Sequence, residues 1–234
     1  MSHAVTARTM PHPVPALLAF IAGFVDICAY FALFGIFVAQ LTGSFVLAGV
    51  RLVSGQQELM TLLAIPMFFL GGCAATAVAV TRAPRGRELS WVLALECVLL
   101  TALLVVGVAT APIEHYSWQM VITALLGIAA MGVQSAGVRL LMKGAPSTTV
   151  MTTNTTQLAI DVTVTLLSAC GCGDGVQTRE SRKRLDDYWP VLAGFFLGTA
   201  AGALCFKLWG LPSLGVPILA AYGLLAWTLR RGGA

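Results

Sequence analysis

The sequence predicts an all-α polytopic membrane protein with six transmembrane helices, two re-entrant or broken segments and an inverted 3+3 repeat. Three observations support this fold class. Of the 234 residues, 58% are hydrophobic and only 10% are charged, whereas a soluble domain carries about 25% charged residues. Apolar runs of about 20 residues, long enough to cross the hydrocarbon core as helices, recur along the chain. The two halves also resemble each other weakly.

Six apolar runs are unambiguous, and they cover 14–35, 59–81, 90–111, 117–141, 188–208 and 212–229. Residues 1–13 are too polar for a signal peptide, so they are predicted to be a cytoplasmic tail before a retained first helix. Two further segments are interrupted by polar residues. The first is 36–53, broken at Thr42-Gly43, and the second is 146–169, which contains the stretch STTVMTTNTTQLAID.

The distribution of basic residues decides how often these two segments cross the membrane. Lysine and arginine collect on the cytoplasmic side of short loops. Eight crossings would divide the 14 basic residues almost evenly, whereas six crossings place all but Arg51 and Lys207 in the cytoplasm. The asymmetric arrangement is strongly favoured. The sequence therefore predicts six crossings, with both termini cytoplasmic.

An internal repeat relates the two halves. Residues 17–35 align with 125–143, which sets Asp26 against Gln134, and 38–49 align with 148–159, which sets Thr42-Gly43 against Thr152-Thr153. Residues 66–72 align more loosely with 194–200. Because each half crosses three times, the repeats at 14–111 and 117–231 must be inverted, the second containing a charged cytoplasmic loop at 171–187. Secondary transporters use this plan often.

The motifs GFVD (23–26), LTG (41–43), GVQ (132–134), TTVMT (148–152) and TQLA (156–159) resemble those of the YoaK-like family, which is built on a domain of unknown function. The resemblance covers nearly the whole chain, from about residue 15 to 230. It implies a protein of the bacterial inner membrane. The family brings no established activity, so the resemblance bears on architecture and location.

The polar residues of the interrupted segments are the candidate solute site. Non-helical or polar backbone at membrane depth is tolerated where protein buries it or water reaches it. If both segments fold back, at Thr42-Gly43 and at Thr152-Thr153, their tips meet near the midplane from opposite sides. The predicted substrate-binding residues are Asp26, Thr42, Gly43, Gln134, Thr152, Asn154 and Gln157. The alternative is that the threonines only bond their own helix turns and neighbouring helices.

Three carboxylates are candidates for coupling or gating. Asp26 lies among apolar neighbours near the middle of the first predicted helix, where it takes up a proton, holds a cation, or is a structural group that is paired or protonated. Glu96 is one to two turns into its helix, so it is either functional or reaches the membrane surface. Asp161 is either a gating group or an ordinary interface charge.

Small residues recur every four positions on two helices. They are Gly194, Gly198 and Gly202 on one helix, and Gly71, Ala75 and Ala79 on the other. This spacing permits close helix packing. The sequence predicts that these two helices pack against each other and join the halves.

The chain carries no nucleotide-binding, hydrolase or zinc-protease motif, so we expect no enzyme, no cofactor and no metal site. The pair Cys170-Gly171-Cys172 alone is a weak metal or redox signal, and the net charge of +4 is too small to indicate nucleic acid. The expected function is a small-solute secondary transporter or facilitator. It would act in the lipid bilayer on a small molecule or ion, driven by a proton or cation gradient if transport is active. The alternatives are a scaffold that binds membrane proteins through its glycine faces, and a passive channel. A homodimer is compatible with so small a bundle.

Overall fold

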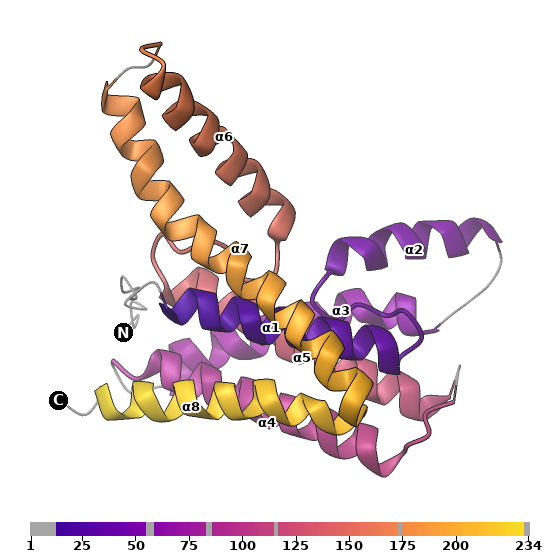
Figure 1. Cartoon of the computed structure of the whole chain (residues 1–234). Coiled ribbons are helices and arrows are strands. Elements are labelled where there is room, and N and C mark those ends of the chain that lie inside the picture. Colours follow the sequence, from indigo (N-terminus) through magenta and orange to yellow (C-terminus); the bar gives the residue numbers. More distant parts are fainter. Residues whose placement is uncertain (1–12, 55–58, 83–85, 115–116, 173–174, 232–234) are drawn as a thin grey trace.

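The computed structural model describes residues 13–54, 59–82, 86–114, 117–172 and 175–231, which form helices and their connections without a β-strand (Figure 1). The elements, in chain order, are α1 (Pro13–Ala32), α2 (Leu41–Ser54), α3 (Leu59–Ala77), the π-helical turn η1 (Val78–Arg82), α4 (Glu88–Ala109), α5 (Trp118–Leu141), α6 (Met151–Ala169), α7 (Gly175–Trp209), the 3-10 turn η2 (Leu211–Leu214) and α8 (Gly215–Arg231).

Six stretches of the described residues are long and apolar enough to cross a membrane. They are Pro13–Ala32, Leu63–Thr81, Glu88–Ala109, Trp118–Leu141, Gly175–Trp209 and Leu211–Arg231. All six predicted helices are therefore present, and the chain is a multi-pass membrane protein by helix length and composition. At 14 residues, α2 is about 21 Å long and falls short of the roughly 30 Å hydrocarbon core.

Residues 175–187 are helical, although the sequence predicts a loop over 171–187. They form the first part of α7, which continues for 35 residues and passes through Pro190 without ending. The loop was predicted from the charged residues of this stretch. The prediction is wrong because glutamate, arginine, lysine and leucine are all strong helix formers. A polar stretch of this kind can extend a membrane helix into water as readily as it can end one.

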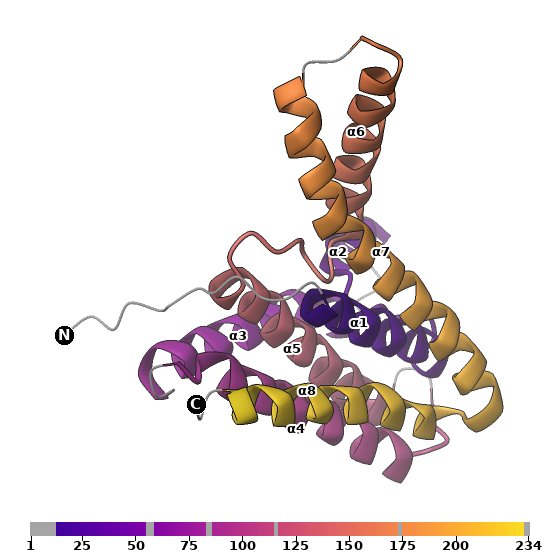
Figure 2. The ribbon, with the colours of Figure 1, turned by 60° about the vertical axis from the view of Figure 1, so that its left-hand side comes forward.

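The centre of the bundle is formed by α1 and α5, whose side chains are mostly buried. Helix α1 packs along α7, while α5 packs along α3 and α4. Helix α8 lies against α4 and α1, so α4 and α8 run side by side at one edge of the bundle (Figures 1 and 2). Both central helices therefore have partners from the other half of the chain.

Glycines bring these partners into backbone contact. A methyl group at Gly198 would overlap the carbonyl of Phe20, and one at Gly23 would overlap the carbonyl of Phe195. Between α3 and α5 the same arrangement recurs, with Gly71 against Ala129 and Gly132 against Phe68. The prediction that the glycine faces serve close packing is confirmed. The predicted pairing is wrong, because α7 packs on α1 and α3 on α5, and a small-residue pattern does not reveal its partner.

Two parts of the chain project from this bundle. Helix α6 and residues 175–189 of α7 form a hairpin, here called the arm, that extends away from the other helices in both views (Figures 1 and 2). In the described part of the chain, α6 packs chiefly on α7 and α2 chiefly on α3. Apolar side chains such as Phe45, Val53 and Leu166 are exposed on these helices. Helices α2 and α6 are consequently the least constrained elements of the fold.

Candidate functional site

Irregular backbone precedes α2 and α6, in residues 33–40 (the first segment) and 142–150 (the second segment). The breaks predicted at Thr42-Gly43 and Thr152-Thr153 are at other positions, and both are helical in the structure. Thr42-Gly43 belongs to the first turn of α2, and Met151–Ala169 is one uninterrupted helix through Thr152-Thr153. The threonine hydroxyls are satisfied within α6, as Thr156 Oγ1 donates to the Thr152 carbonyl at 2.9 Å and Thr163 Oγ1 to the Ala159 carbonyl at 2.8 Å.

Asp26 fastens the first segment to α1. Its Oδ1 accepts the backbone N–H groups of Val38 and Ala39, both at 2.8 Å, and its Oδ2 accepts Gln40 Nε2 at 3.1 Å. The side chain is buried, with 3% of its surface exposed. Three donors converge on this one carboxyl group, so that two backbone N–H groups and an amide are paired that would otherwise be unsatisfied. Asp26 thus fixes the turn that leads into α2.

Gln134 fastens the second segment to α5 and α1. Its Nε2 donates to Thr148 Oγ1 at 2.8 Å and to the Leu18 carbonyl at 3.0 Å. Next to it, Ser135 and Thr149 share a hydroxyl–hydroxyl bond of 2.8 Å. Both segments are therefore held by polar side chains from the preceding long helix. Asp26 and Gln134 serve separate segments, since Leu18 is about 12 Å along α1 from Asp26.

The remaining predicted site residues divide between the helix starts and the arm. Asn154 is buried and donates through Nδ2 to the Ser147 carbonyl at 2.6 Å, which fixes the beginning of α6. Gln157 lies one turn further on and bonds Asp161. Thr42, Gly43 and Thr152 are exposed in the first turns of α2 and α6. The structure does not gather the predicted residues around one central cavity.

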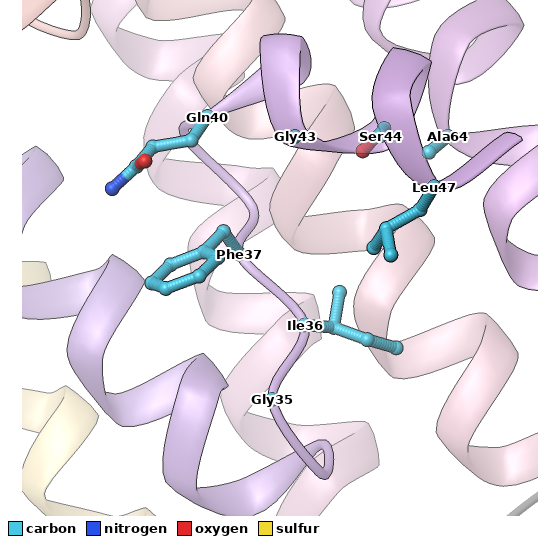
Figure 3. Close-up of a pocket in the computed structure, with 8 residues that line it drawn as sticks. All are labelled: Gly35, Ile36, Phe37, Gln40, Gly43, Ser44, Leu47 and Ala64. Atoms are coloured by element: carbon cyan, nitrogen blue, oxygen red, sulfur yellow. The ribbon is translucent and has the colours of Figure 1, made fainter. Parts of the chain in front are cut away.

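A small pocket opens beside the start of α2 (Figure 3). It encloses about 40 Å³, which is room for water-sized groups. The lining residues are Gly35, Ile36, Phe37, Gln40, Gly43, Ser44, Leu47 and Ala64. Its polar side chains are Gln40, which also bonds Asp26, and Ser44. Of the predicted site residues only Gly43 lines it, although Gln40 and Ser44 were recognisable as polar neighbours of Thr42-Gly43.

An ion pair joins the two helices of the arm. Arg184 Nη2 and Nε both reach Asp161 Oδ1, at 2.8 and 3.1 Å, while Gln157 Nε2 donates to Oδ2 at 2.9 Å. Asp161 is fully buried, in a helix outside the six candidate spans. Burial raises the pKa of this carboxyl group, but hydrogen bonds from Arg184, Gln157 and Ser181 outweigh it and hold the pKa below the ordinary 3.8. The pair latches α6 onto α7.

Replacing Arg184 by alanine is expected to loosen the arm, because a buried charge loses its partner. Spin labels on Thr163 and Arg182 should then report a broader distribution of distances between α6 and α7. The open population should rise about tenfold. Since the pKa of Asp161 is lowered by folding, the stabilisation is complete above pH 3.8 and is lost as the pH falls through the lower folded value. Lys183→Ala, which removes an exposed charge one residue away, should leave the distribution unchanged. Equal broadening in both variants would contradict a latch.

Glu96 belongs to α4 and bonds neither the first nor the second segment. Its side chain is 1% exposed, so it does not reach the membrane surface, and its Oε1 has no hydrogen-bond partner among the described residues. Gln134 Oε1 likewise has no hydrogen-bond partner among the described residues. Burial of Glu96 agrees with a functional or structural acid and excludes the snorkelling alternative.

A family model described as "Protein of unknown function (DUF1275)" matches residues 14–227, nearly the whole chain. The match is consistent with the resemblance to the YoaK-like family. No curated protein and no solved structure matches the sequence.

Proposed function

The chain belongs to the DUF1275 family of proteins of unknown function, and we propose that it is a non-enzymatic secondary transporter or facilitator for a small polar solute in the bacterial inner membrane. One observation carries this proposal. Two irregular segments, 33–40 and 142–150, each follow a helix long enough to span a membrane and lead into a helix that packs chiefly on one neighbour. Irregular backbone between membrane-spanning helices is typical of transporter substrate sites.

An inverted repeat of 14–111 and 117–231 is part of the proposal. It is supported by matching contacts, since α1 with α7 corresponds to α5 with α3, and α2 on α3 corresponds to α6 on α7. The glycine contacts set Gly23 against Gly132, which is one residue from the sequence alignment. Asp26 then corresponds to Ser135, and both bond the segment that follows their helix. Six crossings and the basic residues support cytoplasmic termini.

The moving parts in this proposal are α2 and α6. Rocking of one sequence half against the other is opposed by the glycine contacts, because each half supplies a helix to the other half's central helix. Helices α2 and α6 have no such ties. Swinging α2 outward would break the hydrogen bonds to Asp26 and open the pocket at Gln40 and Ser44 to a polar solute.

The alternatives differ in what they require. A scaffold that binds partners through its glycine faces requires these faces to be exposed. Gly198, Gly132 and their neighbours are instead covered by the chain's own helices. A passive channel would give fast flux that does not saturate with solute concentration. The proposed carrier saturates.

Thiol labelling tests the proposed water path. In a variant without the native cysteines, a single cysteine replacing Ser44 should react with a membrane-impermeant maleimide in proteoliposomes, because α2 opens its pocket to water. The control is Phe196→Cys, whose side chain is 72% exposed on α7 and should be shielded by lipid. If the cysteine at 44 is as unreactive as that at 196 from both sides of the membrane, the first segment is no solute path.

A further inference from the structure

Four acidic side chains of the described residues are buried, and three of them have an evident stabilising environment. They are Asp26, Glu88, Glu96 and Asp161. Asp26 has three hydrogen-bond donors, and Asp161 has Arg184. Glu88 is in the first turn of α4, where the helix dipole favours a negative charge. Glu96 has none of these three kinds of stabilisation. Among the described residues, a negative charge on Glu96 therefore has no evident stabilising group.

The packing of α4 on α5 locates Glu96 relative to Gln134. Val92 of α4 contacts Gly137 of α5, and further along, Gly107 faces Thr123, so the two helices are antiparallel. One turn beyond Val92 is Glu96, and one turn before Gly137 is Val133, next to Gln134. Among the residues that the structure describes, neither Glu96 Oε1 nor Gln134 Oε1 has a donor. The register of α4 on α5 therefore places these two buried residues at about the same level along the bundle.

Among the side chains that the structure describes, the charged and titratable groups around Glu96 provide no counter-ion. On α4 its neighbour is Cys97, and on α5 the basic residue nearest in sequence to Gln134 is Arg139, which is exposed. On α8, Tyr222 bonds Thr101, and the bond from Ser90 to Thr228 fixes the other end of the contact with α4. Between those bonds α8 presents apolar side chains. Two short turns also touch α4. The turn η1 has Arg82 as its last residue, and η2 contains no titratable residue.

We propose that Glu96 is a proton-binding site within the helix bundle, and, resting on the transport function proposed above, that its proton is exchanged with water during the transport cycle. An ionised carboxylate without a partner in such surroundings is strongly disfavoured because it loses its hydration, whereas a protonated one carries no charge to desolvate. Uptake is a simple protonation, in which the carboxylate lone pair forms the O–H bond.

Gln134 connects this proton site to the moving parts. Through Nε2 it holds Thr148, three residues before α6 begins. When the second segment leaves α5, that bond breaks, Gln134 is free to turn, and water gains access to the α4–α5 interface. Protonation of Glu96 therefore favours the closed position of the second segment, and its release accompanies opening.

Infrared difference spectroscopy of the full chain in lipid tests the site without any solute. At neutral pH we expect the carbonyl stretch of a protonated carboxylic acid, lost in Glu96→Gln and retained in the control Glu88→Gln, on the same helix. The band should shift when H₂O is replaced by D₂O. A missing band in the wild type would show that Glu96 is ionised and overturn the proposal. A band that never shifts, while amides of α6 exchange, would overturn the exchange with water.

A transport assay separates the failure of this site from the failure of the proposed function. Once a transported solute is found, Glu96→Gln should remove the dependence of its uptake on the pH gradient and leave downhill exchange of the solute. Unchanged pH dependence in Glu96→Gln would overturn coupling at Glu96 and leave transport standing. The near-identical shape of glutamine keeps the helix packing, and the Glu88→Gln variant controls for expression.

Discussion

Replacing Gly198 by alanine is expected to lower the free energy of unfolding by about 1–3 kcal/mol, the usual range for overpacking a tight interface. The added methyl group would overlap the carbonyl oxygen, carbonyl carbon and Cα of Phe20. These are backbone atoms of α1 and cannot rotate out of the way, so the two helices must separate. Separation also loosens Gly194 and Gly202, which touch the same face of α1. Unfolding by sodium dodecyl sulfate in mixed micelles, followed by circular dichroism, measures the change.

The matched control for this prediction is Gly223→Ala in α8. A methyl group there meets no atom within 4 Å, and alanine is favoured over glycine in helices by up to about 1 kcal/mol. This variant should be as stable as the wild type or more so. An independent repeat is Gly132→Ala, which would press on the Phe68 carbonyl of α3. If Gly198→Ala behaved like Gly223→Ala, the α1–α7 contact would be looser than described.

Replacing Asp26 by alanine is expected to free the first segment and, if the proposed function holds, to abolish solute uptake. The change leaves the N–H groups of Val38 and Ala39 and the Gln40 amide without their acceptor. An unpaired buried polar group costs about 1–3 kcal/mol, so the segment should separate from α1 and let water in. Hydrogen exchange followed by mass spectrometry should show that peptides spanning 33–40 exchange at least about tenfold faster.

Asp26→Asn separates the geometry from the charge. The asparagine retains one oxygen for the backbone donors, but its amide opposes Gln40 Nε2, so exchange over 33–40 should rise less than in the alanine variant. We expect Asp26→Asn to abolish proton-driven uptake in proteoliposomes, because the weakened anchor no longer returns α2 to its closed position. Uptake that is undiminished and still depends on pH in Asp26→Asn would remove Asp26 from the mechanism.

The six crossings were predictable from sequence because they depend on local composition. A run of about 20 apolar residues identifies itself, as in Glu88–Ala109. The two interruptions between helices were predictable in kind but not in place. A helix tolerates threonine because its hydroxyl can bond the carbonyl of the preceding turn, as Thr156 does, so the sequence around Thr152 could not reveal that the irregular backbone precedes α6.

The individual residues of the candidate site were predicted more successfully than their arrangement in space. Asp26 and Gln134 stood out as polar groups in apolar helices, and both prove to be buried and hydrogen-bonded. Their partners are the main chain of 38–39 and the hydroxyl of Thr148, which carry no sequence signature for this role. The bond from Arg184 to Asp161 was missed because residues 175–187 were predicted as a loop. Non-local contacts of this kind are decided by the fold.

The exchange of helices between the halves has a consequence for biosynthesis. Gly23 of α1 and Thr199 of α7, which touch across the interface, are separated by 176 positions. During translation α1 therefore enters the bilayer long before the helix that covers its glycine face has been made. Until α7 emerges from the ribosome, that face must be occupied by lipid or by the insertion machinery, and the bundle can close only after nearly the whole polypeptide has been synthesised.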